Sequence, residues 1–327
     1  MINFDSITFY GAYAELCISF IEYKRSVGYK YDRRQTYSVK YLCDYLSGFS
    51  SDNIGLTRGM VEGYIQKKQE ESAASQVIRV YIVRQFGIYL STLGYQVYLP
   101  PFDCVKKDKT FVPYIYTKDE IKRILKAAEN LTYAYQAPNS YLVYPILVKI
   151  LFGCGLRISE AVSLRMEDVN LTDGILHVRQ SKFNNSRLVP MSQSLVESCR
   201  DYYSKVGYYK GKTVYFFEVS PGIPYNSRSC YNRFRFLLKQ AGIWHGGRGN
   251  GPRLHDARHS YAVYALDQMV KQGMDIYCAL PILSAYMGHR TIESTEKYVR
   301  LVPSFHQDII DVMEPVYKGL FPEVTGR

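Results

Sequence analysis

The sequence predicts a mainly α-helical protein with a small antiparallel β-sheet, an α+β fold. Apolar residues recur at three- and four-residue spacing through the first hundred positions, which is typical of amphipathic helices. Two short strand-like segments at residues 174–179 and 187–190 flank a polar loop and predict one β-hairpin in the second half of the chain. The chain should therefore be helical at first and should carry its sheet inside a later, mainly helical region.

A helix-breaking segment predicts where the chain divides. Residues 99–109 contain the pair Pro100-Pro101 and several lysines, so helix formation is disfavoured and the segment suits a linker. The chain has 327 residues and 47% hydrophobic content, enough for two packed cores. We expect a helical domain over residues 1–110, with its linker from about residue 99, and a second domain over residues 111–327.

The first domain should contain four helices. Thr57 is a plausible N-cap for the third of them, and glycines separate the segments. The helical periodicity covers residues 14–23, 37–46, 57–65 and 75–93.

The second domain should open with a helix at Thr117, because Thr117 and Glu120 have the spacing of a capping box. A second, mostly apolar helix is expected over residues 141–151 and should end at Gly153. Near the end of the chain, apolar residues spaced as on one helix face predict an amphipathic tail helix over about residues 304–321.

Composition narrows the class of partner. The chain has 41 basic and 30 acidic side chains, and a net charge of +11 favours a polyanion such as nucleic acid. Its seven cysteines form no CxxC pair, which suits reduced thiols better than a disulfide framework or a zinc site. The longest apolar run, residues 142–152, is too short to cross a bilayer, and the first residues lack a signal-peptide pattern. We expect a soluble cytoplasmic protein with no membrane partner.

Several residues of the second half suit one task, the attack on a phosphodiester. Arg157 lies near a predicted helix start, His255 and Arg258 are three residues apart in one predicted helix, and His289 precedes Tyr298 by nine residues. Two guanidiniums can neutralise the charge that develops on phosphate oxygens in the transition state. The phenol of Tyr298 is the candidate nucleophile.

The remaining roles concern protons. A free phenol has a pKa near 10, so Tyr298 needs a base and nearby cations, and His255 is our candidate to take its proton. His289 would donate a hydrogen bond to a phosphate oxygen. Lys182, in the loop between the predicted strands, would protonate the departing 5′ oxygen. His259 is predicted to be a packed or hydrogen-bonding histidine without a catalytic role.

These segments resemble the tyrosine recombinases, also called the phage integrase family. The matching residues occur in the order of that family and near its spacings. They are Gly155 to Leu164 around Arg157, Lys182 with Arg187 to Pro190, Leu254 to His259, Met287 to His289, and Tyr298. Departures are mild: Met287 stands where Leu is usual, and Ser181 and Phe183 flank Lys182 where glycines are frequent.

The resemblance implies a helical core-binding domain over residues 1–110 and a catalytic domain over residues 111–327, which close around double-stranded DNA. It implies a 3′-phosphotyrosine link at Tyr298 and a freed 5′-hydroxyl that attacks the partner strand, without metal or other cofactor. The function would be site-specific recombination for integration, excision, transposition or resolution, by a tetramer on nucleoid DNA. An accessory directionality factor is compatible with this role, and the tail helix would pack on its own domain or on a neighbouring protomer.

Two alternative functions are compatible with most of the same residues. A type IB topoisomerase would relax DNA with the same covalent chemistry, although the compact size and helical first domain favour a recombinase. A catalytically silent DNA-binding regulator would lack one of the six residues, and all are present. A metal-dependent transposase is disfavoured because the acidic residues form no recognisable ligand cluster.

Overall fold

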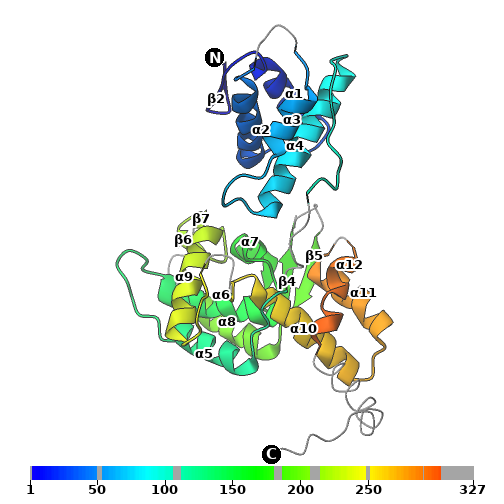
Figure 1. Cartoon of the computed structure of the whole chain (residues 1–327). Helices are drawn as coiled ribbons and strands as arrows, with labels where there is room; N and C mark the ends of the chain where they lie inside the picture. Colours follow the sequence, from blue (N-terminus) through cyan, green and yellow to red (C-terminus); the bar gives the residue numbers. More distant parts are fainter. Residues whose placement is uncertain are drawn as a thin grey trace, which may run out of the picture. The chain divides into compact units, whose positions relative to one another are not determined.

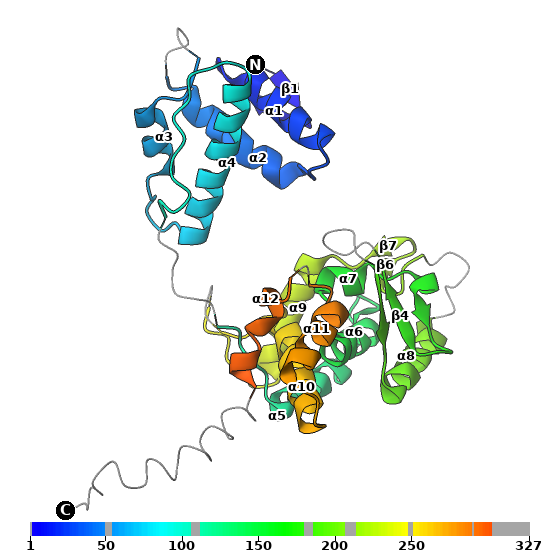
Figure 2. The same ribbon diagram turned by 90° about the vertical axis from the view of Figure 1, so that its right-hand side faces the viewer.

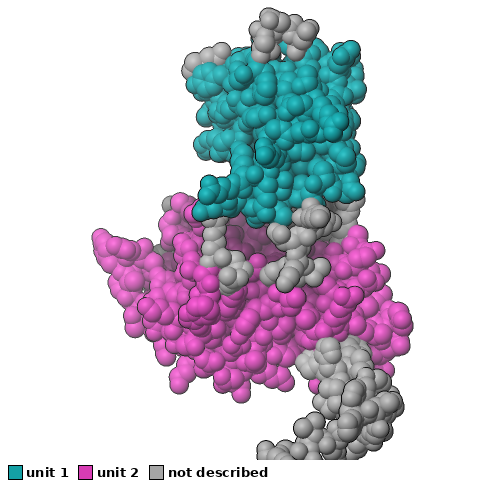
Figure 3. Space-filling view, in the orientation of Figure 1, with its two compact units in different colours: residues 1–111 teal, residues 112–327 magenta. Residues whose placement is uncertain are grey.

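The computed structural model describes residues 2–49, 54–105, 112–179, 186–206, 214–247, 251–289 and 291–302. The chain divides into two compact units, Met1–Phe111 and Val112–Arg327 (Figure 3). The mainly helical fold with small antiparallel sheets confirms the predicted fold class. The predicted tail helix over about residues 304–321 lies outside the described residues.

Unit 1 contains the four predicted helices (Figure 1). They are α1 (Ala14–Ser26), α2 (Arg33–Leu46), α3 (Arg58–Ile65) and α4 (Ala73–Thr92). The side chains of Asp32, Thr57 and Ser72 cap the last three helices by accepting hydrogen bonds from backbone N–H groups of the first turn. Phe20, Leu42 and other apolar side chains on the facing sides of the helices form the core of this unit.

A hairpin that was not predicted precedes these helices. Strands β1 (Ile2–Phe4) and β2 (Ile7–Phe9) pair antiparallel through a tight turn at Asp5 and Ser6, both with positive φ. Ile7 and Phe9 are buried in the helical core. Three-residue strands are too short to show an alternating pattern, so the sequence carried no usable signal for this hairpin.

Unit 2 is larger and contains eight α-helices among its described residues (Figures 1 and 2). They are α5 (Lys118–Glu129), α6 (Ser140–Cys154), α7 (Ile158–Val162), α8 (Gln193–Val206), α9 (Ser227–Gln240), α10 (Asp256–Lys271), α11 (Ile276–Met287) and α12 (Glu293–Glu296). The predicted capping box is present: the Thr117 hydroxyl accepts from the Glu120 N–H, and the Glu120 carboxylate accepts from the Thr117 N–H.

The predicted β-hairpin is also present. Strands β4 (Ile175–Val178) and β5 (Arg187–Pro190) pair antiparallel, and the short strand β3 (Val169–Asn170) adds to the other edge of β4. A second small sheet, β6 (Glu218–Ser220) with β7 (Ile223–Pro224), was not predicted because each strand has only two or three residues. Short strands of this kind depend on tertiary contacts and leave little pattern in the sequence.

The apolar helix α6 lies at the centre of unit 2 and contacts α5, α8 and α10. The prediction that it ends at Gly153 was one residue early, because α6 ends at Cys154 and Gly155 forms its left-handed C-cap with φ +62°. A side chain at Gly155 would meet the ring of Tyr261, with a Cβ only 2.4 Å from a ring carbon. The end of α6 therefore needs a glycine for both reasons, and it places Arg157 two residues later.

A smaller core lies beside the first, where α10 and α11 contact each other (Figure 2). Leu266 of α10 and Leu283 and Met287 of α11 are fully buried there, together with Tyr298. The candidate nucleophile is thus held by apolar packing as well as by polar contacts. Within the described part of the chain, no helix is long and apolar enough to cross a membrane.

Candidate active site

Arg157 occupies the N-cap of α7, and Glu160 holds it there. The Glu160 carboxylate accepts a hydrogen bond from the backbone N–H of Arg157 at 3.0 Å and another from its Nη1 at 2.5 Å. The guanidinium also contacts the end of α11, because Nη2 donates to the carbonyl of Gly288 at 3.3 Å. Glu160 therefore orients Arg157 through both its backbone and its side chain.

Glu160 contacts more than one arginine. Its carboxylate also accepts two hydrogen bonds from the guanidinium of Arg187, at 2.9 Å and 3.2 Å, and Arg258 Nη1 lies 3.8 Å away. Burial alone would raise the pKa of this carboxyl, but Arg187 and Arg157 lower it to about 2. Glu160 is therefore an ionised carboxylate that balances part of the surrounding positive charge.

Arg258 is almost fully buried, with 2% of its surface exposed. Its Nη1 donates to the carbonyl of Gly155 at 2.8 Å, and its Nη2 donates to the carbonyl of Met287. These carbonyls lie at the C-terminal ends of α6 and α11, where the helix dipole favours a cation. Burial, followed by the charge of Arg157, lowers the pKa of Arg258 to about 10, so it stays cationic at neutral pH.

His289 follows Gly288, the left-handed C-cap of α11. Its Nδ1 lies 2.8 Å from the hydroxyl oxygen of Thr295, and its ring stacks on that of Tyr298 with centroids 6.3 Å apart. Burial and the charge of Arg258 lower the pKa of this imidazole to about 3. His289 is therefore neutral, and the contact with Thr295 leaves its Nε2 as the nitrogen available to a substrate.

Tyr298 follows α12 and is 1% exposed. Its hydroxyl oxygen lies 2.8 Å from Nδ1 of His259, and the Lys297 ammonium lies 5.0 Å from the centre of its ring. Burial raises the pKa of the phenol to about 12, against the opposite effects of Arg258 and Arg157. The candidate nucleophile is therefore a neutral phenol in this structure.

Two histidines lie at the start of α10, and the one that contacts Tyr298 is not the one that we expected. His255 is the N-cap residue of α10, and its ring edge meets the ring of His259 with centroids 4.9 Å apart. The histidine in hydrogen-bond contact with the Tyr298 hydroxyl is His259, which was predicted to be a packed or hydrogen-bonding residue. The spacing of four residues between the two histidines puts both on one helix face, and that signal could have identified His259.

The structure thus brings together five of the six predicted site residues: Arg157, His255, Arg258, His289 and Tyr298. Lys182 lies outside the described residues. The strand that follows its loop begins at Arg187, which sequence reasoning did not select although it contacts Glu160 and the carbonyl of Tyr286. Thr295 was missed as well, because a partner for His289 six residues later matches no motif.

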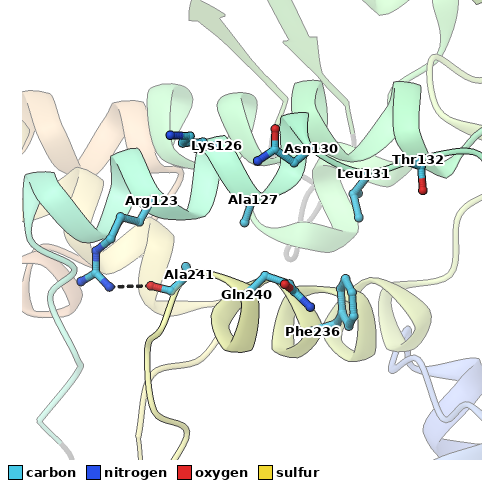
Figure 4. Close-up of a pocket in the computed structure, with 9 residues that line it drawn as sticks. All are labelled: Arg123, Lys126, Ala127, Asn130, Leu131, Thr132, Phe236, Gln240 and Ala241. Atoms are coloured by element: carbon cyan, nitrogen blue, oxygen red, sulfur yellow. Dashed lines mark hydrogen bonds between the residues drawn. The ribbon is translucent and has the colours of Figure 1, made fainter.

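No group of three His, Cys, Asp or Glu residues that could hold a metal ion occurs among the described residues. A separate surface hollow of about 420 Å³ lies between α5 and α9 (Figure 4). Arg123 crosses one end of it and donates a hydrogen bond to the carbonyl of Ala241 at 2.5 Å. None of the five gathered residues lines this hollow.

Two relatives show how far the similarity extends along the chain. A candidate integrase/recombinase of Sinorhizobium fredii, y4rB, is 28% identical over 301 residues, covering 90% of this chain and 95% of that protein. Tyrosine recombinase XerA of Pyrococcus furiosus is 25% identical over 206 residues, covering 61% of this chain and 62% of that protein. The first relative therefore matches both units, and the similarity is not confined to the motifs.

Solved structures show the same fold at low sequence identity. The Tn1549 transposon integrase in complex with circular intermediate DNA has a TM-score of 0.60 at 17% identity, covering 86% of this chain and 94% of that one. The XerH site-specific recombinase bound to its difH substrate has a TM-score of 0.61 at 14% identity, covering 87% and 92%. Finally, the family model of the phage integrases matches residues 115–304, more than half of the sequence. This chain belongs to the phage integrase family, the tyrosine recombinases.

Proposed function

We propose that this protein is a site-specific DNA recombinase that cuts and rejoins DNA strands through a covalent bond between Tyr298 and a 3′ phosphate. One observation carries the proposal. Two cationic arginines, Arg157 and Arg258, and the ring of His289 lie around a buried tyrosine, and both arginines favour ionisation of its phenol. An anion that entered this site would meet two guanidiniums and the phenol together.

The chemistry proposed for these residues follows their charges. Arg157 and Arg258 would bind the non-bridging oxygens of the scissile phosphate and stabilise the charge that builds up there. His289 would donate from Nε2 to one of these oxygens, because its Nδ1 is engaged by Thr295. Lys182 would protonate the departing 5′ oxygen. The energy of the phosphodiester would stay in the phosphotyrosine bond, so the proposed reaction needs no metal and no high-energy cofactor.

The phenol is too weak an acid to ionise in advance. With its pKa at about 12, ionisation of Tyr298 at pH 7 would cost on the order of 7 kcal/mol. Its proton therefore has to leave while the new bond to phosphorus forms, and a base must be in contact with the hydroxyl. The six proposed catalytic residues include His255, the candidate for this base.

The partner proposed for this chain is double-stranded DNA. The net charge of +11 supports a polyanionic partner, and the XerH recombinase and the Tn1549 integrase were solved with DNA. Unit 1 would be the core-binding domain, and four copies of the chain would assemble on paired sites. Integration, excision, transposition and resolution all use this chemistry, and an accessory directionality factor would select among them.

A covalent-trapping experiment tests the proposal. The full chain is mixed with a pool of nicked duplexes of randomised sequence, in which the short cleaved fragment diffuses away and the adduct accumulates. Wild type should yield an SDS-stable adduct, and the recovered DNA should share a sequence. Tyr298→Phe should yield none, while Tyr277→Phe, at a solvent-exposed tyrosine of α11, should behave as wild type. No adduct from wild type, or an equal amount from Tyr298→Phe, would refute the mechanism.

A further inference from the structure

We propose that Lys297 binds a DNA phosphate that flanks the scissile one and thereby positions the segment that carries the nucleophile. This inference rests on the proposed function, since it adds a positioning residue to the same reaction. Lys297 directly precedes Tyr298, and its ammonium lies 5.0 Å from the centre of the tyrosine ring. A cation at this place would meet the strand that the phenol attacks.

The segment from α12 to Tyr298 separates buried from exposed side chains. Thr295 and Tyr298 are three residues apart, so they lie on one helical face, and both are almost completely buried. The hydroxyl of Thr295 also contacts Nδ1 of His289. Lys297 is exposed, so its stem extends from a firmly held backbone and its ammonium stays accessible beside the ring.

Lys297 makes no ion pair with any residue in the part of the chain that the structure describes. Glu293 precedes it by four residues, a spacing that would allow an ion pair on a helix, yet the two are not paired. The Glu160 carboxylate is occupied by Arg157 and Arg187. The Lys297 ammonium is therefore available to an anion from outside the protein.

The surroundings of Lys297 favour such an anion. Burial, and after it the charge of Arg258, lowers the pKa of the Lys297 ammonium. Burial is also the main cause of the lowered pKa values of three imidazoles, and Lys297 contributes to each of them: His255, His259 and His289. Like charges so close together repel one another, and a bound polyanion would relieve that repulsion.

A flanking phosphate suits Lys297 better than the scissile one. The scissile phosphate already has its proposed partners, the guanidiniums of Arg157 and Arg258 and the ring of His289. Successive phosphates of one DNA strand follow at about 3.4 Å along the helix axis, so a cation beside the ring of Tyr298 is within reach of the next one. Binding it would fix the phenol relative to the phosphorus that it attacks.

Three variants test the contact on the DNA site recovered by covalent trapping. Lys297→Met keeps the stem without the charge, and it should form the adduct about tenfold more slowly at saturating DNA. Lys297→Arg keeps the charge and should stay close to the wild-type rate. The slope of log affinity against log salt should become less negative by about 0.9 in Lys297→Met, the value for one phosphate contact. Lys271→Met, at a lysine of α10 paired with Asp267, should match wild type in both measurements.

A second measurement separates a phosphate contact from a structural role. Each phosphate that flanks the scissile one is replaced in turn by a neutral methylphosphonate. At one position wild type should slow about as much as Lys297→Met does on normal DNA, and the variant should slow no further there.

The inference is overturned if Lys297→Met reacts at the wild-type rate, or if Lys297→Arg is as slow as Lys297→Met. It is also overturned if every methylphosphonate slows wild type and Lys297→Met by the same factor. Failure of wild type to form any adduct would instead refute the proposed function.

Discussion

The carboxylate of Glu160 forms a two-pronged ion pair with the guanidinium of Arg187, with nitrogen-to-oxygen distances of 2.9 Å and 3.2 Å. The pair joins α7 to the first residue of β5. Arg187 also donates from Nε to the carbonyl of Tyr286 at 2.7 Å, so it reaches α11 as well. Three elements that carry site residues are therefore connected through one buried carboxylate and one arginine.

Replacing Glu160 by glutamine should destabilise the protein by about 3 kcal/mol or more, because buried guanidiniums lose their counter-charge. Urea unfolding at pH 7 measures this loss. Glu167→Gln is the control, since its carboxylate is 58% exposed and its loss should be about 0.5 kcal/mol or less. Equal losses in the two variants would contradict the role of Glu160 as the buried charge centre.

The same carboxyl predicts an acid dependence. Its pKa in the folded protein is about 2, below the value of about 4.3 in an unfolded chain. The stabilisation is therefore complete above about pH 4.3 and is lost as the pH falls toward 2, by about 3 kcal/mol in total. Glu160→Gln should lack this component, so its unfolding free energy should change less across this window than that of wild type.

The three imidazoles of the site predict a second pH window, at higher pH. Burial, with nearby positive charges, lowers the pKa of His255 to about 4 and those of His259 and His289 to about 3. An unfolded histidine titrates near 6.5, so between about pH 6.5 and 4 the unfolded chain binds protons that the folded chain does not.

Stability should therefore fall as the pH drops through this window, by up to about 1.4 kcal/mol per pH unit for each imidazole. Urea unfolding of wild type at a series of pH values from 7.5 to 4.5 measures the slope. His289→Asn should reduce the slope of unfolding free energy against pH by about the contribution of one imidazole. A slope identical to that of wild type would show that His289 does not stay neutral in the folded protein.

Gly155 and Gly222 form a matched pair for backbone strain. Both have positive φ, +62° and +77°. A Cβ at Gly155 would meet the ring of Tyr261, whereas no described atom lies within 4 Å of a Cβ at Gly222. Gly222→Ala should cost about 1 kcal/mol of stability, from conformation alone. Gly155→Ala should cost at least about 2 kcal/mol, with the steric overlap added. Equal costs would mean that Tyr261 moves aside freely.

Arg258→Lys tests the geometry of the guanidinium. Lysine keeps the charge but cannot span the carbonyls of Gly155 and Met287 or grip two phosphate oxygens at once. We expect single-turnover adduct formation to slow by about a thousandfold, with a smaller change in DNA affinity. Full activity of Arg258→Lys would show that charge alone suffices at this position.

The sequence predicted what depends on local pattern. The four helices of unit 1 follow from three- and four-residue periodicity, and the start of α5 follows from the capping-box spacing of Thr117 and Glu120. Arg157, His255 and Arg258 were found because their neighbours along the chain identify them. In each of these cases the informative residues lie within a few positions of one another.

Other features depend on residues that are distant in the sequence. Glu160 and Arg187 are 27 residues apart, and His259 and Tyr298 are 39 residues apart, so no local pattern links the partners. The choice between His255 and His259 depends on how α10 is rotated relative to the segment that carries Tyr298, which tertiary packing decides. Some strands are too short to show a periodic pattern in the sequence, namely β1, β2, β6 and β7.

The two carbonyl contacts of Arg258 have an evolutionary consequence. A lineage that gave up strand cleavage and kept only DNA binding would be free to lose residues that serve chemistry alone. Arg258 is not such a residue, because it also joins the end of α6 to the end of α11. Its retention in an inactive descendant would therefore say little about activity, whereas a substitution at Tyr298 would be the more telling mark of lost catalysis.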